Sequence, residues 1–147
     1  MSIISKKYEL TNETKKVNIC SGTYIVHRIK ALKDFGDVHK GDLGGWVEKE
    51  SNLSHEGTCW VSDYATVCGE AYVCGNARVS DDAQVYGYAQ VYGNASVYAE
   101  ALIEGTTKVY GNARVYGAAR VSDDAQVHGN ARVYGTAWIV GDASIHN

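Results

Sequence analysis

The sequence of 147 residues contains no proline, one phenylalanine and one methionine. A bulky interior is therefore not expected, because the large side chains that usually fill one are nearly absent. Apolar residues still make up 45% of the chain, so material for a core is present. We expect that core to be built from valine and alanine, in thin and regular layers.

Signals for several functional classes are also missing. The four cysteines (Cys20, Cys59, Cys68 and Cys74) form no C-x-x-C pair, so no metal site is predicted. No secretory leader and no run of membrane-spanning length is visible, and we expect reduced thiols in a cytoplasmic protein. There is no phosphate-binding glycine loop and no nucleophile-elbow serine, and no cofactor is predicted.

Net charge is low, at −3, and is unevenly distributed. Residues 1–50 carry nine basic and seven acidic groups, whereas residues 51–147 carry five and ten. This balance favours neither a general nucleic-acid binder nor a polyanion, and we predict no nucleic-acid or membrane partner.

What the chain does have is a repeat. Gly-Asn pairs begin at residues 75, 93, 111 and 129, and an aliphatic residue recurs at every sixth position from Val61 to Ile145. Six divides eighteen three times, so each turn of the chain should have three flat sides. Such fixed-period self-similarity indicates a repeat architecture. We predict an all-β fold, a single-stranded parallel β-helix that is triangular and has 18 residues per coil.

The repeat unit Ala-x-Val-x-Gly-x also predicts which side chains face inward. Alternate residues share one side of a strand, so alanine and valine should point into the coil and the residues flanking valine should point out. Glycine serves the corner, where positive φ is needed. Val47 and Leu53 resemble earlier rungs, which places the β-helix in residues 46–147. The corner residues that replace glycine are of types that tolerate left-handed backbone: Asp63, Asp81, Asp123 and Asn147.

Residues 1–45 do not repeat, and we predict that they form a small β cap. Residues 24–31 alternate like a strand, and residues 17–20 should pair with it in a hairpin. Residues 34–37 and 41–45 have the composition of turns. A repeat array needs such a cap because its first coil would otherwise expose apolar side chains and unpaired backbone.

Residues 24–38 (YIVHRIKALKDFGDV) and 40–48 (KGDLGGWVE), followed by Val-Tyr-Gly-Asn-Ala-Arg hexads, resemble the YdcK-like proteins. That family is often labelled polymer-forming or putative transferase. The resemblance covers the chain from residue 20 or so onward. It implies a left-handed β-helix related to the hexapeptide acyltransferases, and frequent occurrence in phages and prophages. It assigns no chemistry to individual residues.

Two departures from true hexapeptide acyltransferases weaken an enzymatic interpretation. Glycine here falls two residues after the rung aliphatic, whereas in those enzymes it typically follows directly. Those enzymes also tend to interrupt the coil with a loop that helps to form the acyl-donor site, whereas the hexads from Val61 to Ile145 are uninterrupted.

Stacking at eighteen residues assigns the outward residues to three sides. The first side carries Trp60, Arg78, Ser96, Arg114 and Arg132 before the rung aliphatic, and Ser62, Ser80, Tyr98, Tyr116 and Tyr134 after it. The second side carries Tyr72, Gln90, Lys108, Gln126 and Ser144, with Cys74, Tyr92, Tyr110, His128 and His146. The third side carries Thr66, Gln84, Leu102, Arg120 and Trp138, with Cys68, Tyr86, Glu104, Ser122 and Val140.

The first side holds the candidate binding site. Arg114 and Arg132 should lie one strand spacing apart, where two cations repel by roughly 1 kcal/mol in water. A bound anion or acidic partner would relieve that repulsion, and arginine and tyrosine are favoured at binding hot spots. Three interpretations stay open: a structural Tyr and Arg stack, a self-association interface, or a ligand or partner site. The site residues are Arg78, Arg114, Arg132, Tyr98, Tyr116 and Tyr134.

Three other features have simpler interpretations. The asparagines of the Gly-Asn pairs should form a structural ladder of side-chain amides along one corner. The pairs Asp81-Asp82 and Asp123-Asp124 lie on different corners and fit turn chemistry better than metal binding. His128 could act as a general base in acyl transfer, although an exposed histidine in a slot otherwise filled by tyrosine is more often neutral.

These observations favour a non-enzymatic scaffold or binding protein that forms a trimer, and the resemblance implies that it is phage-encoded. Its partner would be a host protein or a small, nucleotide-like anion, held on the Tyr/Arg side or in a groove between subunits. One alternative is an acyltransferase acting through His128. Another is a structural protein that polymerises through its open C-terminal coil.

Overall fold

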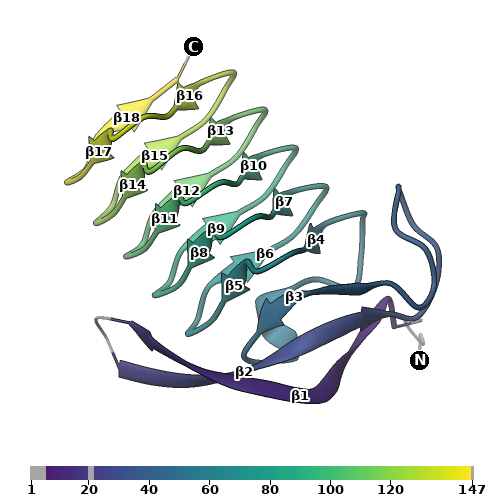
Figure 1. Ribbon diagram of the computed structural model, residues 1–147. Helices are drawn as coiled ribbons and strands as arrows, with labels where there is room; N and C mark the ends of the chain where they lie inside the picture. The colour runs from purple at the N-terminus through teal and green to yellow at the C-terminus, as the bar shows by residue number, and fades with distance from the viewer. Residues whose placement is uncertain (1–5, 20–21, 147) are drawn as a thin grey trace, which may run out of the picture.

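The computed structural model describes residues 6–19 and 22–146, and Cys20, Ser21 and Asn147 therefore lie outside the described residues. A β-hairpin crosses one end of a stack of triangular coils, and the C-terminal coil lies at the other end (Figure 1). The described residues are all-β apart from one short 3-10 helix, η1 (Glu50–Asn52). Among the described residues no helix is long and apolar enough to cross a membrane.

The strands are long in the hairpin and two residues each in the coils. They are β1 (Tyr8–Ile19), β2 (Gly22–Ala31), β3 (Leu43–Val47), β4 (Trp60–Val61), β5 (Thr66–Val67), β6 (Tyr72–Val73), β7 (Arg78–Val79), β8 (Gln84–Val85), β9 (Gln90–Val91), β10 (Ser96–Val97), β11 (Leu102–Ile103), β12 (Lys108–Val109), β13 (Arg114–Val115), β14 (Arg120–Val121), β15 (Gln126–Val127), β16 (Arg132–Val133), β17 (Trp138–Ile139) and β18 (Ser144–Ile145).

Three parallel sheets form the three sides, as the periodicity predicted. Strands β4, β7, β10, β13 and β16 make the first side, β6, β9, β12, β15 and β18 the second, and β5, β8, β11, β14 and β17 the third. On the first side Ser96 pairs with Arg78 and with Arg114, and Arg114 pairs with Arg132. The eighteen-residue register is therefore confirmed, and with it the columns of outward residues.

The core is the predicted ladder of valine and alanine. Rung residues such as Val61, Val91 and Val109 have no exposed surface. Burial of each contributes about 1.5–3 kcal/mol relative to exposure. In the last described coil Ile139 and Ile145 are only partly buried.

The corners need left-handed backbone, and aspartate supplies it with an added hydrogen bond. Asp63, Asp81 and Asp123 have φ near 58°, as predicted, and Ala99 shares this conformation without having been predicted. The Asp81 carboxylate accepts a hydrogen bond from the Ala99 amide at 3.0 Å, and Asp123 accepts one from Gly141 at 2.9 Å. The turn interpretation of these aspartates is thereby confirmed.

The cap continues the third side. Strands β1 and β2 are antiparallel, β2 pairs antiparallel with β3, and β3 pairs in parallel with β5. Val47 pairs with Val67, and Leu53 forms a bridge with Val73, so both are rungs as predicted. The boundary expected between residues 45 and 46 falls inside β3.

Residues 43–45 were wrongly predicted to be a turn, since they belong to β3. The glycines of this strand have no side chain, and this allows neighbouring residues to approach its backbone closely. A Cβ on Gly44 would lie 2.6 Å from the Trp60 ring, and one on Gly45 would lie 2.8 Å from the Ala65 carbonyl oxygen. Composition alone could not separate this use of glycine from a turn.

The cap also covers side chains that were expected to be exposed. Trp60 is buried beneath Phe35 and Tyr8, with ring centroids 5.2 and 6.3 Å away. Cys68 and Tyr86 on the third side are buried in a cluster with Val26 and Trp46. These side chains keep the predicted outward direction, but the non-repeating segment packs over them.

Candidate functional site

Stacked tyrosines line the first side above the cap. The Tyr98 and Tyr116 rings are 4.9 Å apart and nearly parallel, and Tyr116 and Tyr134 are 5.4 Å apart at 13°. The ladder arises because each tyrosine follows a rung valine in successive coils. Tyr134, at the C-terminal end of the ladder, is 59% exposed.

Beside this ladder lie two unneutralised cations. Arg114 and Arg132 are direct neighbours in the sheet and both are exposed. Neither forms an ion pair with any described residue, and neither guanidinium lies over an aromatic ring of the part that the structure describes. Their mutual repulsion is therefore not compensated within the described chain.

Arg78 occupies a different environment from the other two arginines. Its guanidinium donates a hydrogen bond to the Asp37 carboxylate of the cap, and this bond and the nearby positive charge lower the pKa of Asp37. Ser96 separates Arg78 from Arg114 along the sheet. The structure thus brings together Arg114, Arg132 and the tyrosine ladder, which we call the Arg/Tyr surface.

The second side carries a ladder that includes His128. Its ring stacks between Tyr110 and His146 with centroids 5.0 Å from each. Nε2 of His128 lies 3.1 Å from the Ser144 hydroxyl. No carboxylate of the described residues orients this imidazole, whereas a general base commonly relies on such a group.

The asparagine ladder runs along the corner between the second and first sides. Asn76 donates to Asn94 at 3.2 Å, Asn94 to Asn112 at 3.4 Å, and Asn112 to Asn130 at 3.3 Å. The predicted structural role is confirmed, because each amide satisfies the next along the axis.

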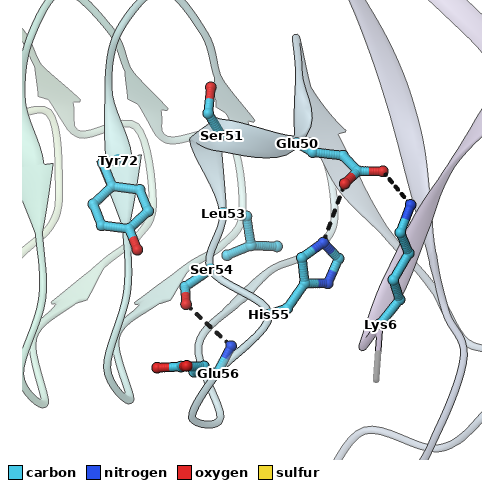
Figure 2. A pocket seen from close by; sticks show the side chains of 8 residues that line it. All are labelled: Lys6, Glu50, Ser51, Leu53, Ser54, His55, Glu56 and Tyr72. Carbon is cyan, nitrogen blue, oxygen red and sulfur yellow. Dashed lines mark hydrogen bonds and ion pairs between the residues drawn. The ribbon is translucent and has the colours of Figure 1, made fainter. Parts of the chain in front are cut away.

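A hollow of about 610 Å³ opens beside η1, and the sequence did not predict it. Figure 2 shows Lys6 and His55 pointing toward the two oxygens of Glu50. The Lys6 hydrogen bond is the main cause of a lowered pKa at Glu50. The available signal was the two additional residues between Leu53 and Val61, which displace this corner from the repeat.

His55 does not have a free nitrogen for catalysis. Its Nδ1 accepts a hydrogen bond from the Lys7 amide at 3.1 Å, while Nε2 lies 3.4 Å from Glu50. Tyr8 stacks on the ring at 4.3 Å. Since both nitrogens and one ring face are engaged, His55 holds the cap to the first coil.

A buried lysine completes that attachment. Nζ of Lys7 donates to the carbonyl oxygens of Cys59 at 2.7 Å and Gly57 at 3.3 Å. Burial lowers the pKa of this amine, and the neighbouring Cys59 partly opposes the effect. Lys7 thus satisfies carbonyls of the first coil that no earlier coil pairs with. Across the described ranges, no three His, Cys, Asp or Glu side chains are grouped to hold a metal ion.

Comparison with known proteins agrees with this architecture. The model of the YdcK β-solenoid repeat matches residues 71–87, 108–123 and 125–141. Over 78 residues the chain is 36% identical to a protein of Escherichia coli strain K12 named "Uncharacterized acetyltransferase YdcK". The match covers 50% of this chain and 24% of that protein, so the chain corresponds to about a quarter of its relative. The matched repeats and the eighteen-residue coils show a YdcK-like β-solenoid.

Proposed function

We propose that this protein is a non-enzymatic scaffold whose Arg/Tyr surface binds an acidic partner. The observation that carries the proposal is the adjacency of Arg114 and Arg132, which lack any acidic counterpart among the described residues. A partner carboxylate or phosphate would compensate both charges. The neighbouring tyrosine ladder adds rigid aromatic area at low entropic cost.

The partner's chemistry follows from the same surface. A flat side on which two arginines are neighbours in adjacent coils suits an acidic protein segment or a small nucleotide-like anion. If the protein is phage-encoded, we expect this partner to be a host protein. The thiols of Cys59, Cys68 and Cys74 are free, which fits a cytoplasmic location.

Binding of two probes tests the proposal. A labelled poly-glutamate peptide represents an acidic protein segment, and ATP represents a small anion. We expect at least one probe to bind the wild-type chain and to lose about tenfold or more in affinity in the Arg114→Glu/Arg132→Glu variant. The variant Lys16→Glu/Lys40→Glu makes the same charge change on exposed cap residues and should bind normally. Equal affinity of both variants for the probe would contradict the proposal.

An acetyltransferase is the second candidate, because the Escherichia coli relative carries that name. His128, beside the Ser144 hydroxyl, is the residue that would act as general base. The unbroken succession of strands from β4 to β18 leaves no loop in the described coils to help form an acyl-donor site. Acetyl-CoA should raise the melting temperature if this candidate is right, and His128→Ala should abolish acetyl transfer without unfolding the coil.

A further inference from the structure

We infer that the acidic partner of the Arg/Tyr surface is a second copy of this chain. The inference rests on the proposed function, since it names the occupant of the same surface. The contact would join the first side of one copy to the third side of the next, with parallel solenoid axes. Its acidic half is the corner that carries Asp124 and Asp142.

That corner forms a carboxylate ladder with the pitch of the arginine ladder. Asp124 and Asp142 are both exposed and occupy the same slot in successive coils, with the Asp124 amide bonded to the Gly141 carbonyl at 2.9 Å. The Thr106 hydroxyl donates to Asp124, while no described residue donates to the Asp142 side chain. Adjacent carboxylates repel, as the adjacent arginines do, and pairing the two ladders would relieve both repulsions.

The two ladders also match in height. Asp124 follows Arg114 by ten residues, and Asp142 follows Arg132 by ten residues. At a coil spacing of about 4.8 Å, each carboxylate lies about 3 Å above the corresponding arginine along the axis. Two parallel copies at nearly the same height would therefore form both ion pairs at once.

Apolar side chains lie between the charged ladders. Trp138 and Val140 on the third side are 64% and 45% exposed, and Tyr134 on the first side is 59% exposed. All three belong to the coils nearest the C-terminus, which we call the upper coils. Facing the first side of one copy toward the third side of the next would bury them against one another, together with Arg120, whose guanidinium lies over the Trp138 ring and pairs with Glu104. The arginine and aspartate ladders would lie toward the rim of the contact.

The cap restricts the contact to these upper coils. On the first side Arg78 is already paired with Asp37, and Trp60 lies beneath Phe35. On the third side the hairpin covers Cys68 and Tyr86. A contact between unlike sides is heterologous, and with parallel axes a rotation that closes it gives a ring of three or more copies. The trimer expected from the sequence is the smallest such ring.

Sedimentation analysis of charge-swapped variants tests the inference. We expect the wild-type chain to form a closed oligomer, and Arg132→Asp or Asp142→Arg alone to raise the dissociation constant about a hundredfold or more. The double variant Arg132→Asp/Asp142→Arg restores the pair between copies and should recover the oligomer. Lys108→Asp, on the second side, is the matched control and should assemble normally. Circular dichroism confirms that each variant is folded.

Two outcomes would overturn the inference. One is a wild-type chain that stays monomeric at high micromolar concentration. The other is a double variant that is folded but no better assembled than the single variants. Poly-glutamate binding that depends on Arg114 and Arg132 in a monomeric protein would preserve the proposed function while rejecting the second copy as its partner.

Discussion

At the scale of single residues, corner backbone conformation sets strict limits. Gly105 has φ +69°, and a Cβ there would lie 2.7 Å from the Asp123 amide nitrogen in the next coil. Gly135 has a similar φ of +67°, but an added Cβ would meet nothing within 4 Å. Comparing substitutions at these two glycines therefore separates the cost of backbone strain from the cost of a steric clash between coils. Ala99 shows that a corner of this solenoid can hold an alanine at positive φ.

We predict that Gly105→Ala lowers the free energy of unfolding by about 2–4 kcal/mol, because it adds a clash to the strain. Gly135→Ala should lower it by only about 1 kcal/mol, from left-handed strain alone. Urea unfolding of the two variants makes the comparison. Equal losses would mean that coil spacing adapts to the added methyl group.

A second residue-scale prediction concerns Cys68. Burial, with a smaller contribution from Glu48, raises the pKa of this thiol from 9.0 to about 12. Below pH 9.0 the thiol is protonated in both folded and unfolded chains. Between pH 9.0 and about 12 only the unfolded chain loses the proton, so the free energy of unfolding falls as pH rises.

The slope from this one thiol is at most about 1.4 kcal/mol per pH unit. Cys68→Ala should flatten the decline above pH 9 but not remove it, because burial also raises the pKa of Cys59 and Cys74. Chemical denaturation at several pH values from 8 to 11 measures both curves. Parallel curves would show that Cys68 is not protected from titration in the folded chain.

At the scale of elements, the burial of a single rung residue determines whether its coil is stable. Val109 in β12 is fully buried, and its neighbour Lys108 on the same strand points outward and is exposed. We predict that Val109→Asp lowers the free energy of unfolding by more than about 4 kcal/mol, because it places a carboxylate in the apolar prism. Lys108→Asp should change it by less than about 0.5 kcal/mol. Melting of Val109→Asp near the wild-type temperature would contradict the inward assignment.

The elements also show how far the sequence could be interpreted. Hexad spacing predicted every coil strand and the columns of Arg114, Arg132 and the tyrosines, because a period determines direction and neighbours together. It could not predict that Trp60 and Cys68 are covered, since the covering strands have no period. The Glu50 and His55 contacts were missed for the same reason, because they depend on how a non-repeating corner meets the cap.

At the scale of the whole molecule, the two ends of the solenoid differ. The hairpin, Lys7 and Tyr8 close the first coil, whereas Trp138, Val140 and Tyr134 remain exposed near the last. Binding chemistry is therefore concentrated in the upper coils, where the Arg/Tyr surface and the acidic corner are both uncovered. On these coils the cations without an acidic partner on the first side are Arg114 and Arg132, and the carboxylates of Asp124 and Asp142 lie at the far edge of the third side, where Arg120 is paired with Glu104.

A binding role for Arg114 and Arg132 requires that they do not stabilise the folded chain. The most direct test is the free energy of unfolding of Arg132→Gln at low ionic strength and at a protein concentration below assembly. Removing one of two repelling cations should leave stability unchanged or raise it by up to about 1 kcal/mol. A loss of more than about 1 kcal/mol would show that the arginine ladder is structural, and would contradict the assignment of this surface to binding.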